Sequence, residues 1–211
     1  MHAIVWMTAA LGLFLMPSAQ VYSAETAPAE SGGGIVWSKQ CQGLLVGVPD
    51  GWVLDNRLAA AQGIDMLFYP TAARKQDGRV DLSLMIYVMP TVKQDNGTSV
   101  STNDLIAEAQ VNLRSQDPAA QWQVEAPVPA AAGGLQLTTA QFEAARMPLF
   151  EEVTYLEDKD VIFAIVLAAR SPSQRLENAG MTQSMARAAS ILVSQQSSPP
   201  CPVLHFPSAT P

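Results

Sequence analysis

The chain has 211 residues, of which 48% are hydrophobic and 15% are charged. This length predicts one domain with tails, and the composition supplies enough apolar side chains for a core, which argues against global disorder. The formal net charge is −7, and the twelve Lys and Arg residues are scattered along the chain. Sequence-independent binding to nucleic acid needs clustered positive charge, and so does binding to an anionic membrane surface, so the charge pattern argues against both.

Residues 4–16 form an apolar run that is followed by small residues, the arrangement typical of a secretory signal peptide. We therefore expect residues 1–23 to be a cleaved signal peptide and the mature protein to be periplasmic or secreted. No Lys or Arg precedes the run, so a buried N-terminal helix and a membrane anchor stay open as alternatives. The run is shorter than the ~20 apolar residues that span a bilayer.

Cys41 and Cys201 are the two cysteines of the chain. In an exported protein an isolated pair predicts a disulfide, because the compartment is oxidising. The bond would join the N-terminal end of the domain to its C-terminal tail. The chain has no C-x-x-C motif and few other soft ligands, which argues against a metal site. We interpret the pair as structural.

The predicted signal peptide leads into a linker, residues 24–35, whose composition is small, polar and rich in Gly. The domain then spans residues 36–194. Residues 195–211 form a tail rich in Pro and Ser, which we expect to be irregular.

Three strands are predicted in the first part of the domain. Residues 43–49 end at a Pro-Asp-Gly turn before Trp52, and residues 64–69 end at Pro70. The third strand, residues 80–89, begins with alternating apolar and polar side chains and becomes apolar on both faces. It is therefore expected to enter a core that is covered from both sides.

A helix is predicted over residues 101–116. Its apolar residues fall on one stripe, and Ser101 followed three positions later by Asp104 is a capping-box pattern. Two further strands are expected at residues 122–126 and 135–143, on either side of a loop rich in Pro, Ala and Gly.

A β-hairpin over residues 150–170 is the central element of the predicted fold. Its turn is charged, at residues 157–160, and its second arm, residues 161–169, is apolar at nearly every position. A strand that is apolar on both faces must be covered on both faces, so we place this arm at the centre of a sheet. A final helix is expected from Ser171, with Pro172 at its first position, to about residue 193.

Strands dominate this order, the last four strands are joined by connections of hairpin length, and two helices accompany them. These features predict an α+β fold, with a mostly antiparallel β-sheet sandwiched between helices. The chain resembles the PsbP-like superfamily, whose members include PsbP, a Ran-binding import factor and DcrB. The resemblance covers residues 36–194 and lies in the segments GLLVGVPDGWVLDN (43–56), GIDMLFYP (63–70), SLMIYVMP (83–90) and YLEDKDVIFAIVLAARS (155–171). It implies an α/β/α sandwich and carries over no functional residue, because the superfamily hosts adaptors, assembly factors and uncharacterised exported proteins.

A search for chemistry yields no catalytic, cofactor-binding or metal-binding set. His205 is the one histidine after the signal peptide, and the chain has no nucleophile elbow, P-loop or G-x-G-x-x-G motif. Glu151 and Glu152 are adjacent on a strand, so they should point to opposite faces, a poor geometry for a paired acid and base. The acidic residues of the hairpin turn could hold a hard cation weakly, but a solvated turn is the simpler interpretation.

Four aromatic residues, Trp52, Tyr69, Tyr87 and Tyr155, could line one end of the sheet and bind a ligand or partner. Burial in the core is the commoner role of such residues. If a partner surface exists, we expect it at Trp52, with Asp50 as its polar neighbour and Tyr69 beside it.

The leading hypothesis is an exported, non-enzymatic domain that binds another envelope protein as an adaptor, stabiliser or accessory factor, without a cofactor. A small-ligand or enzymatic module using an aromatic cavity is the second hypothesis. An immunity or chaperone-like role in a secretion system is the third. An exposed apolar patch would favour the first, and a concave pocket with convergent titratable groups would favour the second.

Overall fold

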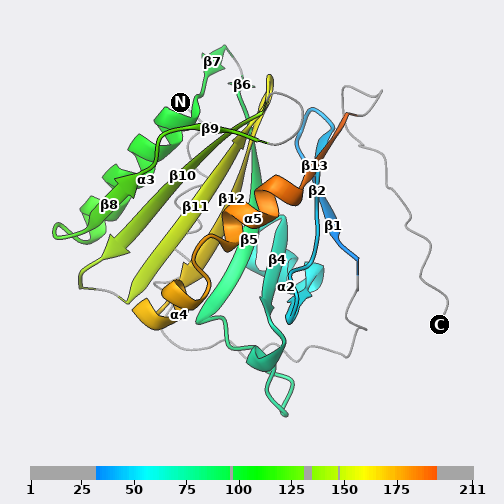
Figure 1. The fold of residues 1–211 in the computed structure, drawn as a ribbon, viewed down its shortest axis with the longest axis vertical. Coiled ribbons are helices and arrows are strands. Elements are labelled where there is room, and N and C mark those ends of the chain that lie inside the picture. Colours follow the sequence, from blue (N-terminus) through cyan, green and yellow to red (C-terminus); the bar gives the residue numbers. More distant parts are fainter. Residues whose placement is uncertain (1–31, 96, 131–134, 147, 194–211) are drawn as a thin grey trace.

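A computed structural model describes residues 32–95, 97–130, 135–146 and 148–193 (Figure 1). The predicted signal peptide, residues 1–23, and the predicted tail, residues 195–211, lie outside the described residues. Within the described ranges, no helix is both long enough and apolar enough to cross a membrane.

The main sheet contains seven strands in a continuous path, with the order β3-β4-β5-β12-β11-β10-β8. All neighbouring pairs in it are antiparallel. A two-residue strand, β9 (Val128–Pro129), also pairs with β10. The seven strands are β3 (Trp52–Leu54), β4 (Met66–Pro70), β5 (Leu84–Val92), β8 (Gln121–Val124), β10 (Gln136–Ala144), β11 (Leu149–Glu157) and β12 (Val161–Ala169).

Two smaller sheets accompany the main one. The first joins β1 (Gly34–Trp37), β2 (Gln42–Val46) and β13 (Ser190–Val193), so that the last described strand pairs with one of the first. The second is the short hairpin of β6 (Gln94–Asp95) and β7 (Thr98–Ser99).

The main sheet is covered on both faces, which confirms the predicted α+β fold. On one face, α3 (Thr102–Gln116) and α2 (Asn56–Gln62) contribute Ile106, Ala109, Leu113 and Ala59 to a core with the sheet. On the other face, α5 (Met181–Ala188) and the three-stranded sheet form a second core. Figure 1 shows α5 crossing the sheet, with the short helix α4 (Pro172–Glu177) preceding it.

Strand β12 is fourth of the seven strands, and all nine of its residues are buried. The prediction that this apolar arm lies at the centre of the sheet is therefore confirmed. Its side chains alternate between the two cores, since Ile162 contacts the α3 core and Phe163 the α5 core. Because both faces of this strand are apolar, neither is favourably exposed to water.

The N-terminal boundaries differ from those predicted. Gly34 and Ile35, assigned above to the linker, belong to β1, and β5 begins at Leu84 rather than at residue 80. The helix α2 was missed. It is seven residues long and is capped by Asp55, whose side chain accepts a hydrogen bond from the Leu58 amide. Such a short helix carries little periodic signal.

The predicted C-terminal helix over residues 171–193 is wrong in its extent. Ser171 caps α4 with Pro172 at its start, as expected, but the chain turns at Gly180, whose φ is 75°. This left-handed conformation suits glycine and divides α4 from α5. The segment after α5 is the strand β13, which pairs with β2.

Helix α3 begins as predicted. The Ser101 side chain accepts from the Asp104 amide, and the Asp104 side chain accepts from the Ser101 amide, so that the capping box is complete. Two of the first amide groups of the helix are thereby satisfied.

Candidate functional site

The predicted partner surface is only partly at the surface. Asp50 is exposed on the turn before β3, and Trp52 is half-buried, with its covered part against the α5 core. Tyr69 is fully buried, so its assignment to this surface is wrong. The reason is its place on β4, an inner strand of the main sheet, next to β5.

The Tyr69 hydroxyl has a structural role beneath this surface. It donates to Asp55 Oδ2 at 3.1 Å and accepts from Arg74 Nη2 at 2.8 Å. Burial is the main cause that raises the pKa of Tyr69. These bonds connect the loop that contains Arg74 to the residue that caps α2.

Two segments form what we call the turn-and-loop surface, residues 50–52 and 71–81. They are adjacent because the Thr71 amide donates to the Gly51 carbonyl at 2.8 Å, and Trp52 pairs with Pro70. Residues 71–81 project from the end of the sheet in Figure 1, between β4 and β5. Lys75 is exposed on this projection. The turn-and-loop surface thus joins a half-buried indole to a projecting, charged loop.

The other aromatic residues confirm the core interpretation. Tyr87 and Tyr155 are buried between the main sheet and α3, on the same face as Glu151. The Tyr87 hydroxyl donates to Glu151 Oε1 at 3.3 Å. Among the described residues, the Tyr155 hydroxyl oxygen has no hydrogen-bond partner. We call these three residues the buried acid cluster.

The electrostatics of the buried acid cluster favour a protonated carboxyl. Burial raises the pKa of Glu151 to about 7, against a smaller lowering by the Tyr87 hydrogen bond. Burial also raises the pKa of Tyr155, and the charges of Glu151 and Glu108 add to that effect. In Glu108, on the facing helix α3, burial again raises the pKa.

Small residues on β12 make room for the cluster. Ala168 lies opposite Glu151 and Ala164 lies opposite Tyr155, both on the strand between β11 and β5. Tyr87 itself lies opposite Val166 of β12, and its hydroxyl reaches Glu151 on β11 diagonally across that strand. The antiparallel register of β5, β12 and β11 thus brings the cluster together.

Glu152 points to the opposite face from Glu151, as the alternation of a strand predicts. Its two carboxylate oxygens accept from the Gly180 amide at 3.1 and 3.2 Å, and Oε1 also accepts from the Thr182 hydroxyl at 2.7 Å. Thr182 in turn contacts Thr154 Oγ1 at 2.8 Å. Glu152 therefore holds the N-terminus of α5 on the sheet.

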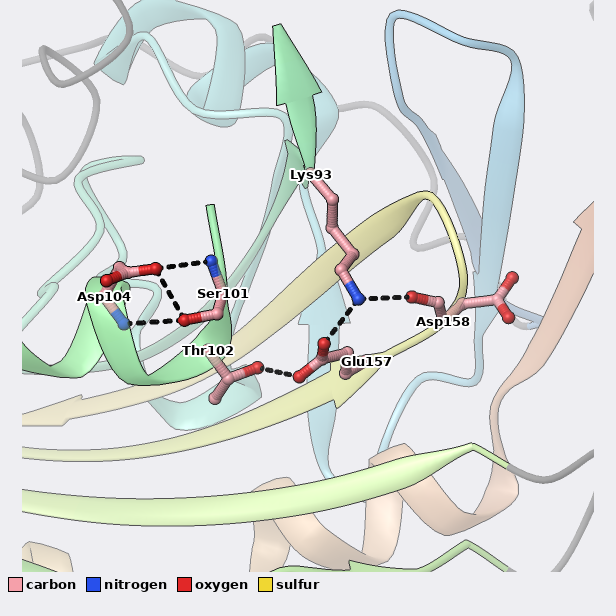
Figure 2. A network of polar contacts seen from close by, with 6 residues as sticks. All are labelled: Lys93, Ser101, Thr102, Asp104, Glu157 and Asp158. Atoms are coloured by element: carbon pink, nitrogen blue, oxygen red, sulfur yellow. Dashed lines mark hydrogen bonds and ion pairs between the residues drawn. The ribbon is translucent and has the colours of Figure 1, made fainter. Parts of the chain in front are cut away.

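A network of polar contacts, drawn in Figure 2, joins the start of α3 to the β11–β12 hairpin. Lys93 Nζ lies 2.6 Å from Glu157 Oε1, and the Thr102 hydroxyl donates to Glu157 Oε2 at 2.6 Å. Burial alone would raise the pKa of Glu157, but these hydrogen bonds and the charge of Lys93 lower it. The carboxylate is thus engaged by protein groups.

Metal-ligand geometry is not found in the part of the chain that the structure describes, where no three His, Cys, Asp or Glu side chains come together. Of the acidic side chains in the hairpin turn, that of Glu157 is bound by Lys93 and Thr102. Cys41 is buried. The predicted disulfide stays a prediction because its other cysteine, Cys201, lies outside the described residues.

Sequence reasoning found the individual residues but missed how they combine. The bond between Tyr87 and Glu151 spans 64 positions, and the one between Glu152 and Thr182 spans 30. The signal available in the sequence was the pair of glutamates inside an apolar strand, since buried carboxyls need partners. No sequence pattern near Glu151 indicates Tyr87 as that partner.

No family model matches the chain, and no curated protein matches it. Among solved structures, it is similar to the cyanobacterial PsbP (CyanoP) from Synechocystis, with a TM-score of 0.47 and 10% sequence identity. The alignment covers 80% of this chain and 98% of that one. The sequence resemblance pointed to the same superfamily.

Proposed function

We propose that this protein is an exported, non-enzymatic accessory domain that binds another envelope protein through the turn-and-loop surface. The observation that carries the proposal is Trp52. Like Trp37 and Trp122 it is a large aromatic residue left half-buried, and it follows the turn at residues 50–51 beside a projecting loop, whereas Tyr69, Tyr87 and Tyr155 are buried. Tryptophan on a protein surface is enriched at interfaces, where it supplies much of the binding energy.

Two carboxylates outside the buried acid cluster have structural partners. Glu152 accepts from the Gly180 amide and the Thr182 hydroxyl, and the partly exposed Glu157 holds α3 to the hairpin. Each carboxylate is therefore accounted for without a substrate. A catalytic base would have to exchange such bonds for contacts to a substrate.

A small-ligand or enzymatic module is the second candidate function. It is favoured by the buried acid cluster, in which a carboxyl with a pKa of about 7 lies beside the Tyr87 hydroxyl. Titratable groups with shifted pKa values cluster at functional sites. A ligand of this kind would have to reach a carboxyl that is buried under α3.

Site-specific photo-crosslinking tests the proposed function. A photoreactive phenylalanine analogue replaces Trp52 in the full chain, expressed in the envelope of its source, and Val111 is replaced likewise as a control. Val111 is 67% exposed on α3, away from the proposed surface. We expect one protein to be cross-linked from position 52 and not from position 111.

The identified protein is then purified and its affinity measured for the wild type, Trp52→Ala and Val111→Ala. Loss of a hot-spot tryptophan should weaken binding by at least tenfold, and the Val111 substitution should change it less than twofold. Equal affinity for the three proteins, or no cross-link from position 52, would contradict the proposal. A thermal shift with small molecules, absent in Glu151→Gln, would favour the second candidate instead.

A further inference from the structure

Glu151 is a deeply buried carboxyl on the α3 side of the sheet, with 6% of its surface exposed. Its hydrogen bond from the Tyr87 hydroxyl is long, at 3.3 Å. A carboxylate in the core needs a cation or several donors, because desolvation disfavours the charge. A single weak donor satisfies a neutral carboxyl far better than an ionised one.

The groups that face Glu151 add no positive charge. From β5 comes Tyr87, from its own strand Tyr155, and from α3 the acidic Glu108, whose charge acts on Tyr155. The neighbours in register, on β10 and β12, are Phe142 and Ala168. Burial raises the pKa of Glu151 and the Tyr87 hydrogen bond opposes that rise, with no contribution from Lys or Arg.

Helix α3 packs on the face of the main sheet to which this carboxyl points. Its apolar residues Ile106, Ala109 and Leu113 belong to the same core as Tyr87 and Tyr155. An ionised Glu151 would place an unpaired negative charge under the helix, on the side where Glu108 already carries one. Opening of α3 would let water reach the charge, so ionisation favours the open state.

We propose that Glu151 is a proton-binding site that makes the packing of α3 on the main sheet depend on pH. With the carboxyl protonated, α3 is closed on the core. As pH rises and the proton leaves, the closed state loses stability relative to states in which α3 is lifted and the carboxylate is hydrated. The Thr102–Glu157 bond holds the N-terminus of α3 on the hairpin, and the Asp117 side chain, which accepts from the Arg146 amide at 2.6 Å, holds the residue that follows α3. Both contacts are independent of Glu151.

Hydrogen–deuterium exchange of the full chain between pH 5.5 and 8.5 tests this inference. The exchange rate of each peptide is divided by its intrinsic rate at the same pH, which leaves the protection factor. In the wild type we expect the protection of residues 106–116 to fall by about tenfold or more across this range, since one pKa unit of differential proton binding is a factor of ten. Protection of β12 should change less.

The matched variants are Glu151→Gln, which keeps the shape without the charge, and Glu143→Gln, on a half-exposed carboxylate of β10. The loss of protection should vanish in the first and persist in the second. Constant protection of α3 in the wild type, or the same loss in Glu151→Gln, would overturn the proposal.

Tyr87→Phe keeps the proposal testable if Glu151→Gln does not fold. The Tyr87 hydrogen bond lowers the pKa of Glu151, so its removal should move the midpoint of the α3 transition to higher pH. A carboxyl carbon resonance of Glu151, followed by NMR, should report the same midpoint. A midpoint unchanged in Tyr87→Phe would refute the assignment to Glu151.

Discussion

Glu152 provides the sharpest test of how the last helices are attached to the sheet. Its carboxylate accepts from the Gly180 amide and the Thr182 hydroxyl, and 2% of the residue is exposed. In Glu152→Ala both donors lose this acceptor. Thr182 keeps its contact with Thr154, at 2.8 Å, whereas within the described ranges the Gly180 amide donates to Glu152 alone.

Hydrogen bonds to a charged group contribute about 1.5–3 kcal/mol each. Removal of a buried charge recovers part of its desolvation, so we expect Glu152→Ala to lower the free energy of unfolding by about 3 kcal/mol rather than by the full sum. Glu152→Gln keeps one acceptor oxygen and should cost about 1–2 kcal/mol. These losses are a large fraction of the stability of an ordinary domain, about 5–15 kcal/mol.

The assay is equilibrium unfolding in urea, with Glu143→Ala as the control. Glu143 pairs with Arg175 at 3.4 Å, and 47% of its side chain is exposed, so its removal should cost less than about 1 kcal/mol. The reasoning is refuted if Glu152→Ala stays within 1 kcal/mol of the wild type, or if both variants lose the same amount. A selective rise in amide exchange over residues 181–188 would place the loss at α5.

Three further outcomes are expected. The folded-state pKa of Glu151, about 7, lies above its usual value of 4.5. The protonated carboxyl therefore stabilises the folded state fully below pH 4.5, and this stabilisation is lost as pH rises to about 7. The shift corresponds to about 3 kcal/mol, and urea titrations of wild type and Glu151→Gln at several pH values measure it. Lys93→Met should lower stability by about 0.5–1 kcal/mol at low salt and less at high salt, because both side chains of its pair with Glu157 are partly exposed. If Cys41 and Cys201 form the predicted disulfide, the mature protein should take up a thiol reagent only after reduction, and Cys41→Ser should cost up to about 5 kcal/mol in a thermal or urea melt.

The centre of the fold could be predicted because its signal is local. Nine successive buried positions in β12 leave one arrangement open, a strand with both faces covered. The start of α3 and its capping box could be predicted in the same way, since Ser101 and Asp104 are three positions apart. In each case the deciding interactions lie within a few residues of one another.

The C-terminal segment shows where such reasoning stops. Residues 171–193 contain apolar side chains at helical spacing, and that periodicity hid the turn at Gly180 and the strand β13. Pairing of β13 with β2 is a contact between the two ends of the domain, which no local pattern encodes. The buried acid cluster has the same origin, because β5 must be placed beside β12 before Tyr87 can meet Glu151.

The pairing of β13 with β2 also determines when the protein can finish folding. Strands β1 and β2 are synthesised well before β13, the strand that pairs with β2. Until then the apolar side of the small sheet, with Val36, Leu44 and Val46, lacks part of its cover. The α5 core therefore closes only once residues 190–193 have been synthesised, and its apolar side chains stay partly uncovered until then.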